Sequence, residues 1–158
     1  MLQLLSCFYL LKEIKPIRKS FFEKLNTITK LLIIISVVSL LIKLTLQLCS
    51  AIPALHQLAF GSRPIVIAYL HLVLLGFISL ALLAYLQINQ LLIHSKLASF
   101  ALVLFIAGLF VNELVLMLQG IRFVYYFNLP YSDLLLLIAA ICLFISSTLY
   151  ALSQRKLN

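Results

Sequence analysis

Four long apolar stretches constrain this chain more than any other feature of its sequence. They lie near residues 31–52, 64–86, 97–119 and 134–152. A helix needs about 20 apolar residues to cross about 30 Å of hydrocarbon. Only helices and closed barrels satisfy their backbone within lipid, and these stretches lack the alternation of a barrel strand. The sequence therefore predicts an all-α integral membrane bundle of four transmembrane helices.

The composition agrees with this class. Of the 158 residues, 65% are hydrophobic and 10% are charged, whereas a soluble domain has about 45–50% apolar and about 25% charged residues. The net charge of +8 would suggest a nucleic-acid partner for a soluble protein. In a membrane protein, Lys and Arg gather on the cytoplasmic side instead. We therefore expect the lipid bilayer as partner, with other membrane subunits or a second copy of the chain as further options, and no nucleic acid.

The positions of the basic residues predict the orientation of the helices. A basic cytoplasmic flank, residues 1–30, precedes the membrane domain 31–152, and a short cytoplasmic tail, 153–158, follows it. Arg63 and Arg122 are the basic residues expected on the opposite side. The positive-inside rule then places both termini in the cytoplasm of a cell membrane, the inner membrane in a bacterium. The basic residues on the cytoplasmic side are Lys12, Lys15, Arg18, Lys19, Lys24, Lys30, Lys96, Arg155 and Lys156.

The chain starts with a short apolar segment, "MLQLLSCFYLL", which is followed at once by "KEIKPIRKS". The segment is too short to span a bilayer. Two interpretations are open: an interfacial amphipathic helix, or the inner end of a truncated spanning helix whose beginning this chain lacks. We favour the second, because an abrupt positive flank is typical of a helix that reaches the cytoplasm.

Motifs of soluble enzymes are missing from the sequence. It contains no Walker A, GxGxxG, HExxH or GxSxG motif. Its three cysteines are far apart and form no CxxC pair, so they indicate buried thiols rather than a zinc or iron–sulfur site. We therefore assign no catalytic residue, and whether the chain is an enzyme stays open.

Three ionisable residues lie deep inside the predicted helices. At about 1.5 Å per residue, His71, Glu113 and Lys43 lie roughly 10, 9 and 13 Å below the outer boundary. A charged side chain near the bilayer centre costs about 2.5–3.5 kcal/mol, so such residues face the bundle interior and pair with one another. The sequence therefore predicts a buried polar cluster of Lys43, His71 and Glu113 in the outer half of the membrane.

Each member of the cluster also has a plainer interpretation. Lys43 can extend its long side chain outward to the interface. Glu113 can stay protonated and donate a hydrogen bond to a backbone carbonyl. His71 can serve as a structural hydrogen-bonding link between helices. The alternative for His71 is a role as a ligand or a proton relay.

The segment around His71 resembles a known family. "AYLHLVLLGFISLALLAY" is similar to haem-binding helices of the haem-copper oxidase superfamily, in particular its nitric oxide reductase-like branch with its uncharacterised bacterial multi-spanning relatives. The resemblance covers about 25 residues. It implies an all-helical membrane core with metal sites toward the outer face. It also implies that His71 is a ligand, either of the iron of a haem cofactor or of a copper ion.

The sequence also departs from that family. A six-coordinate haem takes two axial ligands, and a copper centre of this type takes several imidazoles. The chain has three histidines, and His56 and His94 lie in predicted links on opposite sides of the membrane. Three hypotheses follow: first a haem-copper oxidase-like module, second a structural or assembly protein without catalysis, and third a small proton or ion transporter subunit.

Overall fold

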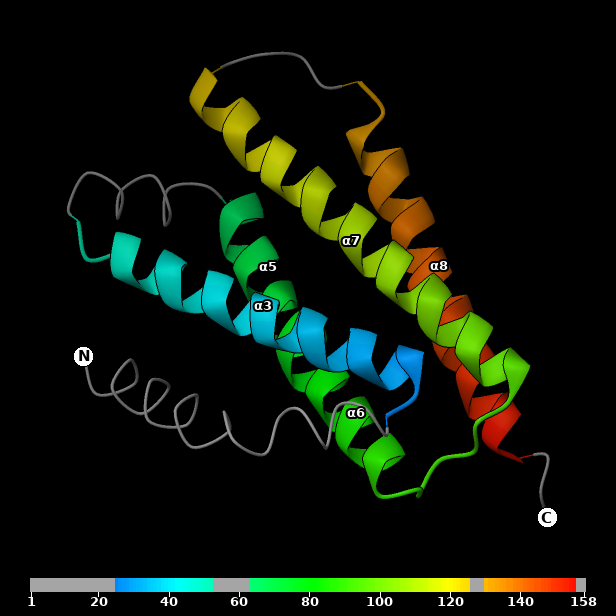
Figure 1. Ribbon diagram of the computed structural model, residues 1–158. Helices are drawn as coiled ribbons and strands as arrows, with labels where there is room; N and C mark the ends of the chain where they lie inside the picture. Colours follow the sequence, from blue (N-terminus) through cyan, green and yellow to red (C-terminus); the bar gives the residue numbers. More distant parts are fainter. Residues whose placement is uncertain (1–24, 53–62, 126–129, 156–158) are drawn as a thin grey trace.

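The computed structural model describes residues 25–52, 63–125 and 130–155 of the chain. The described residues form four long helices joined by links (Figure 1). The first is α3 (Thr27–Cys49); the second consists of α5 (Arg63–His71), η1 (Leu72–Ser79) and α6 (Leu80–Ile88) in direct succession; the third is α7 (Lys96–Tyr125) and the fourth α8 (Ser132–Arg155). All four are long and apolar enough to cross a membrane. The predicted all-α four-helix architecture is confirmed, as expected for a multi-pass membrane protein.

The helices differ from the predicted ranges mainly at their ends. α3 begins four residues earlier than predicted and ends at Cys49, after which Ser50, Ala51 and Ile52 continue only as turns. α7 runs past Gly120 to Tyr125, beyond the predicted end near residue 119. Here glycine is tolerated because a neighbouring helix packs directly over it. The predicted N-terminal segment, His56 and the last three residues of the tail lie outside the described residues.

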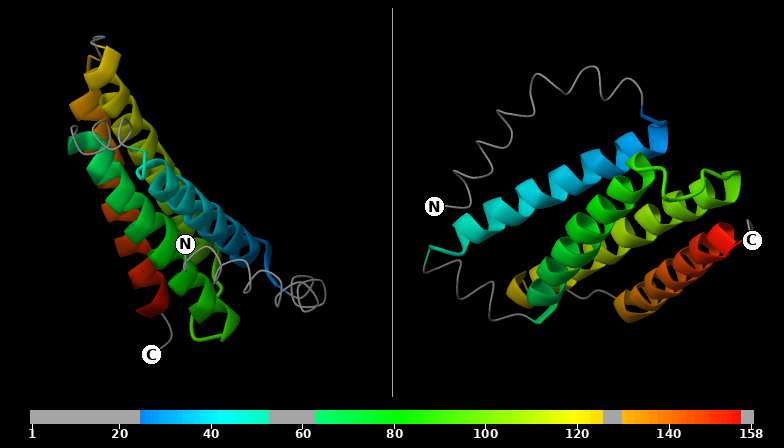
Figure 2. Two further views of the ribbon diagram at one scale, coloured as in Figure 1. Left: turned by 90° about the vertical axis from the view of Figure 1, so that its left-hand side faces the viewer. Right: turned by 90° about the horizontal axis from the view of Figure 1, so that it is seen from below.

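The four helices pack in the order in which they follow one another in the sequence, each against the next. α7 and α8 lie antiparallel along most of their length, and α5 packs against α7 (Figures 1 and 2). α3 packs against η1 and α6 and crosses them at an angle, so its later half diverges from α7 (Figure 2). The bundle is therefore tighter where α3 begins than where α3 ends.

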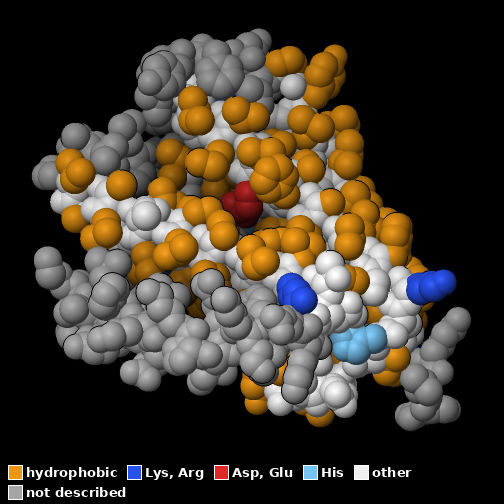
Figure 3. All heavy atoms as spheres, viewed as in Figure 1, with side chains coloured by type: hydrophobic (Ala, Val, Ile, Leu, Met, Phe, Trp, Pro, Cys, Tyr) orange, Lys and Arg blue, Asp and Glu red, His pale blue; other side chains and the backbone are white. Residues whose placement is uncertain are grey.

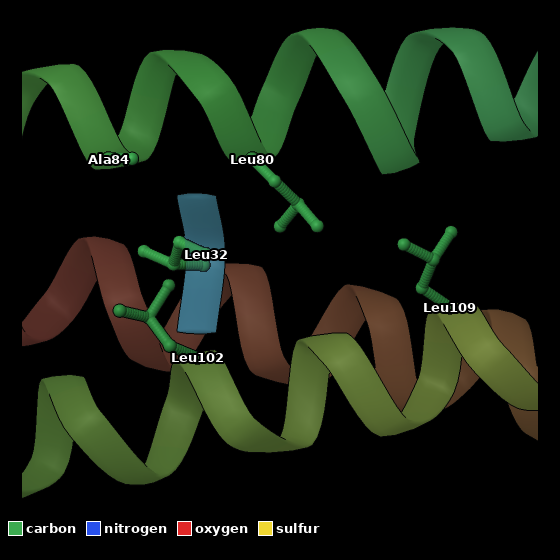
Figure 4. Close-up of a cluster of buried hydrophobic side chains, with 5 residues drawn as sticks. All are labelled: Leu32, Leu80, Ala84, Leu102 and Leu109. Atoms are coloured by element: carbon green, nitrogen blue, oxygen red, sulfur yellow. The ribbon is translucent and has the colours of Figure 1, made fainter. Parts of the chain in front are cut away.

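The hydrophobic core lies in this tighter part. Leu32 of α3 sits between Ala84 of α6 and Leu102 of α7, and Leu80 and Leu109 extend it toward the middle of the bundle (Figure 4). All five are at most 5% exposed. Most other large apolar side chains of the described helices point outward, and the space-filling view shows an almost continuous apolar surface (Figure 3). An apolar surface of this extent is typical of a protein that contacts lipid.

The second span is not a uniform α-helix. Its middle part, η1, is a π-helix of eight residues that begins directly after His71. Ser79 Oγ donates a 2.9 Å hydrogen bond to the Leu74 carbonyl, five residues earlier. π-Helices are rare, and most are single-turn bulges close to functional sites. Nothing in the residues of this segment predicts a π-helix.

Candidate polar site between α5 and α7

The contact between Ile65 and Gly120 fixes how α5 lies against α7. A Cβ atom added to Gly120 would stand 2.5 Å from Ile65 Cγ1, so the glycine allows the two helices to approach closely. The helices run in opposite directions from this contact (Figure 1). At about 1.5 Å per residue, His71 on α5 and Glu113 on α7 lie roughly 9 and 10 Å from it. Both therefore reach the same level of the bundle on neighbouring helices, as predicted for this pair.

The imidazole of His71 has one nitrogen occupied and one available. His71 is partly buried, and its Nδ1 is 2.9 Å from the Ile67 carbonyl oxygen. A carbonyl oxygen only accepts, so Nδ1 carries the hydrogen and donates it. In the neutral ring, Nε2 is then an acceptor, and it makes no hydrogen bond to a described residue. This nitrogen can take a proton, accept a hydrogen bond or bind a metal.

Glu113 carries a buried oxygen without a partner. Its side chain is partly buried, and Oε1 is enclosed but makes no hydrogen bond to any described residue. His71 lies at about the same level on α5, which packs against α7. The pair thus combines a carboxyl group and an imidazole in surroundings that supply little other polar contact.

Asn112 is a further polar group beside this pair that the sequence analysis missed. It is 7% exposed, and its Nδ2 is buried without a partner among the described residues. The amide lies close to the Glu113 carboxylate without meeting the geometry of a hydrogen bond. Its signal in the sequence was an amide directly next to a carboxylate within an apolar run. Two neighbouring side chains on α7 are therefore incompletely satisfied, which is unusual for buried polar groups.

The third predicted residue, Lys43, lies on another helix. It lies on α3, which packs against η1 and α6 and diverges from α7 beyond them. Of the three predicted cluster residues, His71 and Glu113 lie at about one level on the packed helices α5 and α7, and Lys43 lies on α3. That the three side chains form one polar cluster stays a prediction.

The described residues alone do not complete a haem or copper site. Within the described ranges, no group of three or more His, Cys, Asp or Glu side chains is arranged to hold a metal ion. His94 is exposed in the link between α6 and α7, at the opposite end of the second span from α5, and His56 lies outside the described residues. His71 is thus the only histidine within the described helices. Binding of a haem or copper through His71 stays a prediction.

A separate set of polar contacts lies at the end of the bundle where α3 begins. Thr29 Oγ1 donates to Gln87 Oε1 over 2.9 Å in a buried contact. Gln154 of α8 accepts a 2.8 Å hydrogen bond from the Ile93 amide in the link between α6 and α7. The hydroxyl of Tyr150 is also buried there, without a partner among the described residues. Because the first two contacts are satisfied and join different segments, they serve packing rather than chemistry.

Comparison with known proteins adds no functional assignment. No known family model matches the sequence, and neither a curated protein nor a solved structure is significantly similar to the chain.

Proposed function

We propose that this multi-pass membrane protein is a small proton- or ion-transporting subunit that exchanges a proton at the pair of His71 and Glu113. The observation that carries this proposal is the buried Glu113 Oε1, which has no hydrogen-bond partner among the described residues. It lies on α7 at about the level that His71 reaches on the neighbouring helix α5. Glu and His residues within membrane spans are typical members of proton relays.

The physical chemistry of the pair supports proton exchange. A carboxylate without a partner in apolar surroundings is costly, and protonation removes that cost. A protonated Glu113 can pass its proton to Nε2 of His71 through a bridging water, and this transfer produces an imidazolium and a carboxylate. The two states differ by one proton position, and each leaves the pair electrostatically neutral overall. Such a pair can accept a proton from one side and release it to the other.

The proposal includes the orientation of the protein and the depth of the pair in the membrane. Lys30, Lys96 and Arg155 lie at one end of the described bundle, and Arg63 and Arg122 lie at the other. This distribution supports cytoplasmic termini in a cell membrane, with the pair in the outer half. Four helices with so much outward-facing apolar surface do not enclose a path by themselves. We therefore propose that copies of the chain, or another membrane subunit, complete it.

The test is infrared spectroscopy combined with a flux assay. In purified protein, the carboxylic C=O stretching band of Glu113 should appear and disappear with pH and be lost in Glu113→Gln. Proteoliposomes with a pH-sensitive dye inside should show a proton flux that Glu113→Gln and His71→Ala abolish. Asp133→Asn is the matched control, because this carboxylate lies at the start of α8 outside the pair. Wild-type flux in folded Glu113→Gln would contradict the proposal.

Haem or copper binding is the second candidate. It is favoured by one observation, the donation of His71 Nδ1 to the Ile67 carbonyl, because ligating histidines usually fix the other ring nitrogen in this way. An optical spectrum of protein from haem-replete cells, oxidised and then reduced, separates the candidates. A Soret band that vanishes in His71→Ala would support haem binding. A flat spectrum together with no proton flux would favour a structural or assembly role.

A further inference from the structure

The π-helix η1 stands between two parts of the second span that are held by different neighbours. Beyond η1, α6 is fixed in the core by Leu80 and Ala84. Before η1, α5 rests on α7 through Ile65 and Gly120. His71 is the last residue of α5. The direction of its side chain relative to the core therefore depends on the winding of η1.

α3 contacts η1 at two serines. Ser36 Oγ donates a 3.1 Å hydrogen bond to the Phe77 carbonyl oxygen. One turn further along α3, Ser39 lies against Gly76, where an added Cβ atom would stand 2.9 Å from Ser39 Oγ. Ser36, Ser39 and Gly76 are all buried. The serines thus supply a hydrogen bond and a close contact along the same π-helical segment.

The winding of a π-helix has a direct geometric consequence. Its hydrogen bonds reach five residues back rather than four, so each residue turns less about the helix axis than in an α-helix. If residues 72–79 rewound as an α-helix, α5 would rotate relative to α6. His71 would then point in another direction relative to α6 and the core.

We infer that η1, clamped by Ser36 and Ser39 of α3, is the positioning element that sets the rotation of α5 and turns the His71 imidazole toward Glu113. The functional meaning of this inference rests on the proposed function, but the geometry can be tested separately. Ser36, Ser39 and Gly76 are positioning residues that act through His71.

A disulfide cross-link reports the rotation of α5 on α7. Ile65→Cys and Gly120→Cys are introduced into a chain without its native cysteines, and the rate of oxidative cross-linking is measured. We expect Gly76→Ala to lower this rate several-fold, because the new methyl group pushes against Ser39. The double variant Ser39→Ala with Gly76→Ala should restore the rate, since the remaining Ser39 Cβ would be 3.4 Å away. Ser36→Ala should lower it more mildly.

Gly108→Ala is the matched control, because Gly108 faces Cys142 and Leu143 of α8 rather than η1. It should leave the cross-linking rate unchanged. If Gly76→Ala does not fold, the double variant Ser39→Ala with Gly76→Ala serves as the test. A folded double variant that cross-links at the wild-type rate supports the inference. A folded double variant that cross-links slowly overturns it. A wild-type rate in folded Gly76→Ala also overturns it.

The infrared band of Glu113 links the geometry to the proposed function. A rotated His71 should shift the pH at which this band disappears in Gly76→Ala, and the double variant should reverse the shift. A changed cross-linking rate without any shift would overturn the claim that η1 acts on the pair. If the wild-type protein shows no proton flux, the proposed function fails, while the cross-linking still decides whether η1 positions α5.

Discussion

Thr29 of α3 and Gln87 of α6 are joined by a buried hydrogen bond of 2.9 Å, the one bond between two side chains that links α3 to the second span in the described part of the chain. The bond lies at the same end of the bundle as the leucine core. Each partner would otherwise leave a polar group enclosed by apolar side chains. This contact therefore fixes where the first helix crosses the second.

Loss of the threonine hydroxyl should weaken the fold. Hydrogen bonds between membrane helices contribute on average about 0.6 kcal/mol and at most about 1.7 kcal/mol. We expect Thr29→Val to lower the free energy of unfolding within this range, measured by SDS titration in mixed micelles. Thr45→Val is the control, because the exposed Thr45 hydroxyl bonds only the Ile42 carbonyl of its own helix. Equal losses for the two variants would contradict the assigned role of Thr29.

The glycines of the spans should differ in their tolerance of a methyl group. Gly120→Ala places a Cβ atom 2.5 Å from Ile65 Cγ1, whereas in Gly108→Ala the nearest neighbour is at 3.3 Å. Overpacking costs about 1–3 kcal/mol, and alanine gains up to about 1 kcal/mol over glycine in helix propensity. We expect Gly120→Ala to lower the free energy of unfolding and Gly108→Ala to leave it nearly unchanged. Ile65→Ala should rescue the former, and failure of this rescue would place the cause elsewhere.

The buried carboxyl group of Glu113 should lower the free energy of unfolding of the protein. A buried polar atom without a partner costs about 1–3 kcal/mol. We therefore expect Glu113→Met to raise the free energy of unfolding by an amount of this order while it abolishes proton flux. Asp133→Met should act in the opposite direction. Asp133 accepts a hydrogen bond from Gln119 and lies in the first turn of α8, where a negative charge is favourable. A destabilised Glu113→Met would mean that the carboxyl group has an unseen structural partner.

Gln154 should protect the amide of Ile93 from hydrogen exchange. Its side chain accepts a hydrogen bond from the Ile93 amide and also donates to the Ile93 carbonyl over 3.4 Å. A typical hydrogen bond contributes about 0.5–1.5 kcal/mol, so Gln154→Ala should speed exchange at Ile93 by up to about tenfold. Asn89→Ala is the control, because Asn89 Nδ2 donates only within its own helix. Unchanged exchange at Ile93 would show that Gln154 does not hold this link.

The sequence was sufficient to predict the four helices, because the cost of unpaired backbone in lipid leaves few other options for long apolar runs. The common level of His71 and Glu113 was also predictable from helix rise, since successive helices run antiparallel. The angle at which α3 crosses its neighbours was not predictable, because depth in the membrane says nothing about it.

The π-helix could not be read from its own residues. Leu72–Ser79 is an apolar run with one glycine, a pattern equally suited to an ordinary α-helix. Its winding is accompanied by contacts from Ser36 and Ser39, which are distant in the sequence. Asn112 was missed for a related reason, because only the packing around α7 reveals that its amide is buried without a partner.

The bond between Gln154 and Ile93 also imposes an order on biogenesis. The two residues are 61 positions apart, so the ribosome completes the Ile93 link long before it makes Gln154. Until α8 has been inserted beside α7, the Ile93 amide lacks the partner that it has in the folded protein. The link between the second and third helices is therefore finished only when the fourth helix is in place. Insertion of that helix therefore completes the hydrogen bonding of this link.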